Sequence, residues 1–370
     1  MKIGIDISPI YKDQAGIGNY AKNLTQALLN LDLKNEYFLY YFGQKPRFLP
    51  KRNNIHWIMI PFSQVLPFKG IRWIRRVARH AKAKDLDLFL SYSYQLFSLV
   101  FPRTFQFIHD LSPIKLPRYY SPKTSSVYKF TTKIAASRAL HLVTISKTMQ
   151  KELSTYANLP ENRLSFIYPG LSNILKNSDK KGTNKAYEKI KLTANYLLTV
   201  STLEPKKNIH TLIKAFLYFK KYNLSDYKLV IVGKKGWGYQ ELFQAVRKDT
   251  AEKEILFLDY VPDLELKKLY QKAKIYINIS KYEGFGMTPM EALYFNIPTI
   301  LSDIPVFKEC YNGLVKFVDF QDIKQIAAAI KEYTDNPRKK NTKDFIVKLY
   351  SWEKSAHKLL KIFSKYARKN

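Results

Sequence analysis

The chain has 370 residues, of which 46% are hydrophobic and 15% aromatic, and its formal net charge is +32. This length is too great for one ordinary hydrophobic core and suits two domains of about 150 to 200 residues, while the apolar content excludes a largely disordered chain. Because Cys310 is the only cysteine, the sequence excludes an intrachain disulfide framework and a cysteine-based structural zinc site.

Short apolar runs alternate with amphipathic helical stretches along the chain, a pattern typical of parallel sheets covered by helices on both faces. A polar, lysine-rich stretch at 176–184 divides the pattern into two α/β halves. In the first half we predict strands at 2–7, 37–42, 55–60, 86–90, 105–108, 141–144 and 164–167, and helices at 18–31, 71–84, 123–139 and 147–157. In the second half we predict strands at 196–200, 228–232, 255–258, 275–278, 299–301 and 315–317, and helices at 322–334 and from Ser351 onwards.

A glycine-rich segment, Gly16-Ile-Gly-Asn-Tyr20, follows the first predicted strand and precedes an amphipathic helix. Gly16 and Gly18 would let the backbone approach a ligand closely, and the free N–H groups of a helix start favour a phosphate. The third glycine of the dinucleotide fingerprint is absent, so an ordinary strand-to-helix turn remains the alternative.

A second candidate, Thr202-Leu-Glu-Pro-Lys-Lys-Asn208, follows the strand at 196–200 and opens a helix. Cations at the carboxyl end of a strand, beside a helix N-terminus, suit a diphosphate in an open α/β sheet. A solvated lysine pair is the alternative in so lysine-rich a chain, and the placement favours Lys207 over an ordinary surface lysine.

The strongest signal is Tyr282-Glu-Gly-Phe-Gly-Met-Thr-Pro-Met-Glu-Ala-Leu293, directly after the strand at 275–278. Gly284 and Gly286 allow a tight turn. We expect Thr288 to cap the next helix and Pro289 to occupy its first position, which leaves free N–H groups for an anion.

Only one of the two glutamates in this block has a purely structural explanation. Glu291 could serve only as the capping-box partner of Thr288, tying down the start of the helix. Glu283 has no such capping role, and a carboxylate beside two glycines is better explained by sugar hydroxyls, from which it can accept hydrogen bonds in pairs.

A fourth candidate is Phe107-Ile-His-Asp-Leu111, where an apolar strand ends in His109 and Asp110. A loop pair without catalytic interest is its alternative. The six histidines lack metal-ligand spacing, and neither a G-x-S-x-G nor a G-x-x-x-x-G-K-[ST] motif occurs. We therefore expect no bound metal and no cofactor.

Together these motifs resemble the retaining glycosyltransferases of family 4 over nearly the whole chain. Glu-Gly-Phe-Gly-x-x-Pro-x-Glu-Ala is the most specific of them. The resemblance implies the GT-B fold, with two Rossmann-like domains facing a central cleft: an acceptor-binding domain at 1–185, completed by a C-terminal helix at 351–370 that crosses back to it, and a donor-binding domain at 186–350. The further landmarks are Tyr168-Pro-Gly170, Val230-Ile-Val-Gly233 and Ser351-Trp-Glu353.

The resemblance also implies roles for particular residues in binding a nucleotide-sugar. Glu283 would bind the donor sugar, Glu291 the ribose, and Lys207 the diphosphate as its bond to the sugar breaks. His109 would lie near the transferred sugar. The remaining donor-binding positions are Gly16, Gly18, Thr202, Lys206, Gly233, Gly284, Phe285, Gly286, Met287 and Thr288.

The implied reaction is metal-independent: the nucleoside diphosphate leaves, and an acceptor hydroxyl attacks, on the same face of the sugar. Many family members carry an arginine where this chain has Ser201-Thr202, and Lys206 is our candidate for the missing charge. The segment 202–208 is most similar to mannosyl- and rhamnosyltransferases of surface-polysaccharide pathways. We therefore predict transfer of mannose from GDP-mannose to a glycan or lipid-linked acceptor, with a UDP- or dTDP-linked glucose, galactose or rhamnose as the alternative.

The segment Ile71–Lys84 reads as a basic amphipathic helix, with Ile74 and Val77 on its apolar face and Arg75 and Arg79 elsewhere. It would dock on an anionic membrane or, alternatively, pack its apolar face in the core. No signal peptide and no run of about 18 apolar residues occurs, so we expect a cytoplasmic protein, peripheral on the inner face of the plasma membrane. Nucleic-acid binding is disfavoured, because the basic residues are dispersed and no recognition motif is present.

Overall fold

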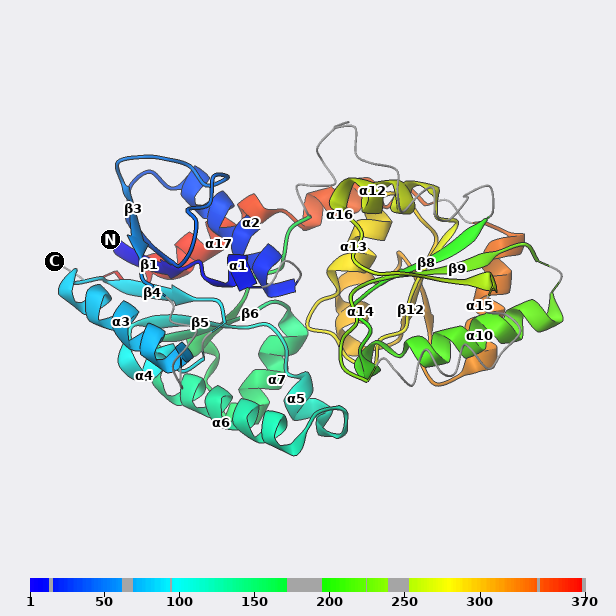
Figure 1. Ribbon diagram of the computed structural model, residues 1–370, viewed down its shortest axis with the longest axis horizontal. Coiled ribbons are helices and arrows are strands. Elements are labelled where there is room, and N and C mark those ends of the chain that lie inside the picture. The colour runs from blue at the N-terminus through cyan, green and yellow to red at the C-terminus, as the bar shows by residue number, and fades with distance from the viewer. Residues whose placement is uncertain are drawn as a thin grey trace. The chain divides into compact units, whose positions relative to one another are not determined.

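The computed structural model describes residues 1–12, 16–61, 69–93, 95–171, 195–223, 225–238, 253–337 and 340–367. The chain forms two compact units (Figure 1). The first comprises Met1–Gly170 with Tyr350–Asn370, and the second comprises Leu171–Leu349. The predicted linker at 176–184 and the predicted boundary after Lys185 lie outside the described residues.

Among the described residues, the first unit holds a seven-stranded parallel sheet with the order β3-β2-β1-β4-β5-β6-β7. Its central strands are buried along nearly their whole length, as a parallel sheet covered on both faces requires. The strands are β1 (Lys2–Asp6), β2 (Glu36–Tyr41), β3 (Ile55–Met59), β4 (Leu88–Ser91), β5 (Thr104–Ile108), β6 (His141–Thr144) and β7 (Leu164–Phe166).

Helices cover both faces of this sheet, with α2 and α17 on one side and α3, α4 and α6 on the other (Figure 1). Strand β2 shows why, because its side chains alternate between two apolar cores. Tyr37 and Leu39 pack with α2 and α17, whereas Phe38 and Tyr40 pack with α3 and α4. The helices are α1 (Pro9–Lys12), α2 (Gly16–Leu31), α3 (Lys69–Ala83), α4 (Phe97–Val100), α5 (Ser112–Lys115), α6 (Pro122–Arg138), α7 (Lys147–Ala157) and α17 (Trp352–Ser364), with 3-10 turns η1 (Pro117–Tyr119) and η2 (Glu161–Arg163).

The C-terminal helix α17 is part of the first unit, as predicted. Trp352, Leu359 and Phe363 are buried in the core that α17 shares with α2. A Cβ at Gly170 would lie 2.3 Å from the backbone nitrogen of Trp352, so only glycine allows the start of α17 to pack there. The glycine of the Tyr-Pro-Gly motif therefore has a packing role.

Among the described residues, the second unit holds a six-stranded parallel sheet with the order β10-β9-β8-β11-β12-β13. Helices α10 and α15 pack on one face, and Figure 1 shows α12 and α13 on the other. The strands are β8 (Tyr196–Val200), β9 (Lys228–Val232), β10 (Ile255–Leu258), β11 (Ile275–Asn278), β12 (Thr299–Ser302) and β13 (Lys316–Val318). The helices are α10 (Ile209–Tyr222), α12 (Asp263–Lys272), α13 (Met287–Tyr294), α14 (Pro305–Tyr311), α15 (Ile323–Asp335) and α16 (Lys343–Leu349), with the 3-10 turn η3 (Pro205–Lys207).

When the strands of each unit are numbered along the chain, both sheets have the order 3-2-1-4-5-6 of the doubly wound Rossmann arrangement, and the first adds a seventh strand beside the sixth. The predicted Rossmann-like class is confirmed, and the predicted strands fall within two residues of the observed ones. No described helix combines the length and the apolarity needed to cross a membrane.

One prediction about the first unit is wrong in detail. Gly16 and Gly18 do not form a turn before the helix, because α2 begins at Gly16. The helix starts two residues earlier than expected, and Ile17 in its first turn packs against the core of this unit. Gly16 has a φ of 22°, and Gly18 is buried within the first turn.

Candidate active site

The candidate site of the second unit lies at the carboxyl ends of β8 and β11. These two strands are neighbours in the sheet, and the strand order reverses between them. Ligands of open α/β sheets bind outside the strand ends at such a switch point. The loop after β8 and the loop after β11 are tied together here, because the backbone N–H of Lys281 donates to the carbonyl of Lys206 at 2.8 Å.

The two loops bring Lys207 and Glu283 into direct contact. Lys207 Nζ lies 2.6 Å from Glu283 Oε1, and their side chains are only 16% and 11% exposed. The sequence predicted both residues as parts of one donor site, and they do lie together, although they are 76 positions apart. The pair joins a cation suited to phosphate and a carboxylate suited to hydroxyl groups.

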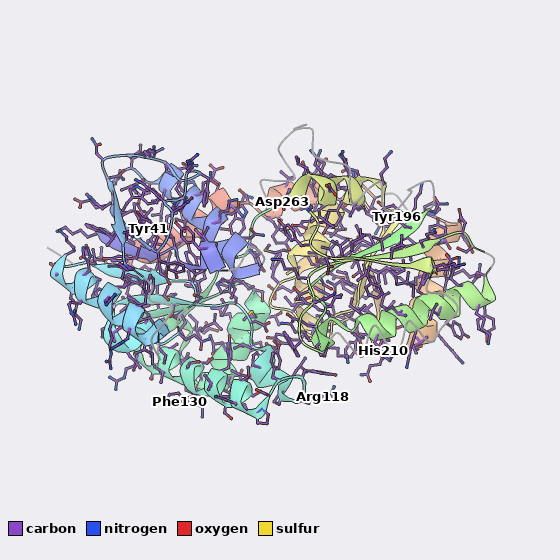
Figure 2. The ribbon with its side chains drawn as sticks, viewed as in Figure 1. Tyr41, Arg118, Phe130, Tyr196, His210 and Asp263 are labelled. Carbon is purple, nitrogen blue, oxygen red and sulfur yellow. The ribbon has the colours of Figure 1, made fainter. Side chains whose placement is uncertain are left out.

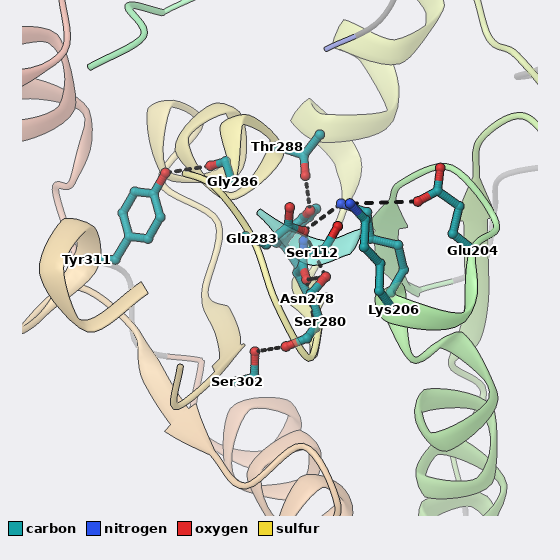
Figure 3. A network of polar contacts seen from close by, with 12 residues as sticks. Ser112, Glu204, Lys206, Asn278, Ser280, Glu283, Gly286, Thr288, Ser302 and Tyr311 are labelled. Atoms are coloured by element: carbon teal, nitrogen blue, oxygen red, sulfur yellow. Dashed lines mark hydrogen bonds and ion pairs between the residues drawn. The ribbon is translucent and has the colours of Figure 1, made fainter. Parts of the chain in front are cut away.

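A serine that the sequence analysis missed supports this pair, as Figure 3 shows. Ser280 Oγ lies 2.8 Å from Glu283 Oε1 and 2.7 Å from Asn278 Oδ1, and its single proton can serve one acceptor at a time. The carbonyl of Ser280 accepts from Ser302 Oγ at 2.6 Å, which ties β11 to β12. The available signal was its place, two residues beyond a buried strand.

The start of α13 differs from the prediction. Gly286, with a φ of 89°, is the N-cap, so Thr288 and Pro289 lie inside the first turn and not at the cap and first position. A Cβ at Gly286 would lie 2.5 Å from the ring of Phe307, and its carbonyl accepts from Tyr311 Oη at 2.6 Å. These contacts hold Gly286 at the N-cap, so the helix begins two residues earlier than predicted. Gly286 offers no side chain to cap this end, and an N-terminus of this kind suits an anion.

The capping-box alternative for Glu291 is wrong. Thr288 Oγ1 accepts a hydrogen bond from Tyr276 Oη at 2.7 Å, and Glu291 Oε2 accepts one from Tyr270 Oη at 2.9 Å. Burial raises the pKa of the Glu291 carboxyl to about 7, Asp263 adds to the rise, and the hydrogen bond from Tyr270 opposes it. The carboxyl therefore takes up or releases its proton near neutral pH.

The other predicted residues of this unit are mainly structural in their visible contacts. Gly233 has a φ of 156°, and a Cβ there would lie 1.8 Å from the carbonyl oxygen of Ser201, so the loops after β8 and β9 can run together only because it is glycine. The isolated bridge between Leu203 and Lys235 continues this contact. Thr202, which directly precedes Leu203 in the loop after β8, is half-buried.

Lys206 is buried, and its Nζ lies 3.9 Å from Glu204 Oε2. Its role as a substitute for the family arginine stays a prediction. Gly284 and the Phe285 side chain are buried, the latter at 6.2 Å from the ring of Tyr311, and Met287 is the first residue of α13.

In the first unit, His109 follows β5. Burial lowers the pKa of its imidazole to about 4, while a hydrogen bond to the backbone carbonyl of Tyr92 and the charge of Asp110 oppose the shift, so the ring is neutral at physiological pH. Its Nε2 is covered and has no hydrogen-bond partner among the described residues. The ring packs against Tyr20 with 5.0 Å between centroids.

Within the described ranges, no three histidine, cysteine, aspartate or glutamate side chains gather as a metal site would require. The absence of a metal and a cofactor from the reaction stays a prediction.

Comparison with known families decides the class of the protein. Residues 180–369 match the model of the glycosyl transferases group 1, and residues 15–172 match that of glycosyltransferase family 4. The chain belongs to the glycosyl transferases group 1, and its first half matches family 4. The resemblance read from the donor-site motifs is thus confirmed, and the site at β8 and β11 lies in the half of this glycosyltransferase that matches group 1.

Similar proteins of known name include two mannosyltransferases. The chain is 33% identical to the O-antigen chain mannosyltransferase RfbU of Salmonella typhimurium over 62% of its own length and 60% of that protein. It is 26% identical to O-antigen chain mannosyltransferase B of Escherichia coli over 89% of its length and 90% of that protein. The predicted enzyme class, a family 4 hexosyltransferase, is confirmed.

Solved structures share the fold. Sucrose-phosphate synthase from Thermosynechococcus elongatus superimposes with a TM-score of 0.76 at 17% identity, covering 99% of this chain and 98% of that one. Anabaena Alr3699/HepE, solved in complex with UDP and glucose, gives 0.74 at 16% identity, covering 98% and 99%. The predicted GT-B fold is confirmed, and at these identities the likeness concerns the fold alone.

Proposed function

We propose that this glycosyltransferase transfers mannose from GDP-mannose to a glycan or lipid-linked acceptor in cell-surface polysaccharide synthesis, with retention of the anomeric configuration. The observation that carries the proposal is the contact between Lys207 and Glu283 at the switch point of the second sheet, beside the uncapped start of α13. The names of the two similar mannosyltransferases support the sugar and the pathway.

The proposed chemistry follows from the charges at this point. As the bond from the anomeric carbon to the diphosphate breaks, negative charge grows on the leaving oxygen, and Lys207 with the first N–H groups of α13 would stabilise it. Glu283 would accept hydrogen bonds from the sugar hydroxyls. The acceptor oxygen bonds to the anomeric carbon on the face that the diphosphate leaves, and its proton passes to the departing diphosphate.

Three further assignments stay predictions. Glu291 would bind the ribose of the donor, Gly16 and Gly18 would contact its phosphates, and His109 would lie near the transferred sugar. Because its ring N–H is donated to the carbonyl of Tyr92, the neutral imidazole would offer Nε2 as an acceptor for a hydroxyl. The reaction would need no metal or cofactor. The enzyme would work in the cytoplasm at the inner face of the plasma membrane, where a lipid-linked acceptor is held.

A UDP- or dTDP-sugar is the alternative donor. The likeness of the fold to Alr3699/HepE, a protein solved with UDP and glucose, supports keeping it.

A donor panel tests the proposal. GDP-mannose, UDP-glucose, UDP-galactose and dTDP-rhamnose would each be incubated with the protein in the presence of EDTA, and release of nucleoside diphosphate measured. We expect the fastest release with GDP-mannose, and an α-linked product by NMR with a suitable acceptor. Faster release from a UDP- or dTDP-sugar would support the alternative donor. Absence of binding and of release with every donor, or an inverted product, would contradict the proposal.

A further inference from the structure

One surface of the first unit is strongly basic and carries no acid. Beyond Lys69, helices α3 and α6 contain nine lysine and arginine residues, and α3, α4 and α6 contain no aspartate or glutamate. No ion pair joins these basic side chains to an acid within the described part of the chain. The basic residues whose side chains the structure describes are Arg72, Arg75, Arg76, Arg79, Lys82, Lys123, Lys129, Lys133 and Arg138.

Large apolar side chains are exposed on the same helices. Phe130 is 64% exposed, Val127 54% and Leu99 49%. In α6, Val127 and Phe130 lie one turn apart on the solvent-facing stripe, with Lys123 and Lys133 one turn before and after them. Figure 2 labels Phe130 on this helix. A single exposed apolar side chain is ordinary, but several that lie together beside basic residues suit contact with an apolar phase.

The three helices form one surface. They lie side by side on the same face of the sheet, α4 packing against both α3 and α6 (Figure 1). Their inner sides are fixed in the core, since Trp73, Val77 and Phe97 are buried. The arginines of α3 and the apolar side chains of α4 and α6 therefore all point away from the sheet.

The apolar side of α3 is consequently not available to a membrane, and the core-packed alternative for that side is correct. Of the large apolar side chains of α3, Ile71 is the exposed one, at 39%. We infer instead that the outer surface of α3, α4 and α6 docks on an anionic lipid bilayer, with Leu99, Val127 and Phe130 entering the acyl boundary and the basic residues contacting lipid phosphates.

The mixture of side chains favours a bilayer over a nucleic acid. A polynucleotide uses aromatic rings for stacking, and it gains nothing from exposed leucine and valine. An anionic bilayer uses both components, since apolar side chains enter its interface and each nearby arginine or lysine adds to binding. The proposed membrane-bound acceptor gives this surface a purpose, but the surface contains none of the donor-site residues.

Vesicle binding tests the inference. Full-length protein would be sedimented with vesicles of phosphatidylcholine alone or with phosphatidylglycerol added, at low salt. We expect binding only to the anionic vesicles, weakened about a hundredfold in the triple variant Arg72→Gln, Arg75→Gln, Arg79→Gln, given the contribution of each basic residue near an anionic surface. Lys214→Gln, Lys274→Gln, Lys324→Gln removes three exposed charges from the second unit and is the matched control.

The apolar contribution needs its own pair of variants. Val127→Ser, Phe130→Ser should weaken vesicle binding about tenfold without changing the net charge. Phe345→Ser, Val347→Ser removes two side chains of 45% and 43% exposure from α16 and should leave binding unchanged.

Three outcomes would overturn the inference: wild-type protein that ignores anionic vesicles, equal losses in the matched controls, or tight binding of a single-stranded oligonucleotide in place of vesicles. Release of nucleoside diphosphate from a soluble donor without vesicles reports separately on the proposed function. We expect the α3 and α6 variants to keep it. If the wild type binds anionic vesicles but releases no nucleoside diphosphate from any donor, the proposed function is contradicted and the docking inference is not.

Discussion

At the scale of single residues, Lys207 and Glu283 each supply the other's counter-charge. With side chains 16% and 11% exposed, neither is fully solvated, so removing one leaves the other charge in a poor environment. Breaking such a pair by truncation costs about 3 kcal/mol when both groups are well buried. Substitution by alanine would therefore change stability together with activity, and an isosteric variant separates the two.

Glu283→Gln is that variant. It keeps the size of the side chain and its contact with Ser280 but loses the carboxylate, so we expect turnover to fall about 10²- to 10³-fold with a much smaller change in melting temperature. Steady-state release of nucleoside diphosphate and thermal unfolding provide the two measurements. Near-normal turnover in this variant would show that Glu283 serves only to hold Lys207.

Glu291 predicts a pH dependence of stability. Its pKa is about 7 in the folded chain against 4.5 ordinarily, so between these values the folded state binds more protons than the unfolded state. Its contribution to the free energy of unfolding therefore falls as pH rises through this window and levels off above it. In Glu291→Gln this fall is absent, so the free energy of unfolding of the variant should rise relative to that of the wild type between about pH 4.5 and pH 7. Parallel urea-unfolding profiles would contradict the shift.

At the scale of elements, the donor site depends on loops that pack closely after parallel strands. The loops after β8 and β9 run together through the backbone of Leu203, whose N–H donates to Lys234 at 2.9 Å and whose carbonyl accepts from Gly236 at 3.1 Å. Gly233 permits this approach. The glycine is thus explained by packing against Ser201, and a direct role in binding donor remains a prediction.

Gly233→Ala tests the packing explanation. A Cβ at 1.8 Å from a backbone oxygen cannot be accommodated without moving the loop, so we expect a loss of about 3 kcal/mol or more in the free energy of unfolding. Gly313→Ala is the control within the same unit: its φ is 76°, but nothing lies within 4 Å of the added atom, so it should cost only about 1 kcal/mol. Equal costs for the two variants would point to backbone strain alone.

At the scale of the whole molecule, the first unit is completed by residues from the end of the chain. Helix α17 buries Phe363 in the core with β5 and α2, and Arg103 donates to the carbonyl of Tyr366 at 2.9 Å. The chain must therefore be synthesised to its last helix before this unit can complete its core.

Phe363→Ala should destabilise the first unit specifically. Truncating a fully buried phenylalanine costs about 3–5 kcal/mol, and hydrogen exchange should show increased opening of β5, β6 and α2 with the strands of the second unit unchanged. Phe345→Ala, at a position 45% exposed in the second unit, serves as the control and should leave both units protected. Equal loss of protection in the two units would show that they unfold together.

The sequence by itself determined the two parallel sheets and the family, because strand period, helix amphipathicity and the spacing of the Glu283–Glu291 block are local properties of the chain. It also identified Lys207 and Glu283 as members of one site. What it could not determine was their 2.6 Å contact, the support from Ser280, or the pairing of Glu291 with Tyr270. The contact between Lys207 and Glu283 depends on β11 pairing with β8, the hydrogen bond from Ser280 on the folding of the loop after β11, and the pairing of Glu291 with Tyr270 on α12 packing beside α13.

The same reason explains the wrong cap of α13 and the burial of the apolar side of α3 in the core. A capping box is a local pattern, but distant side chains decide the contacts here. Gly286 packs against the ring of Phe307, while Tyr276 and Tyr270 donate hydrogen bonds to Thr288 and Glu291. An amphipathic helix likewise does not say what covers its apolar side, since its partner is a distant strand. Only the tertiary structure decides which surface of a helix stays in contact with water, because burial is a property of the assembled core.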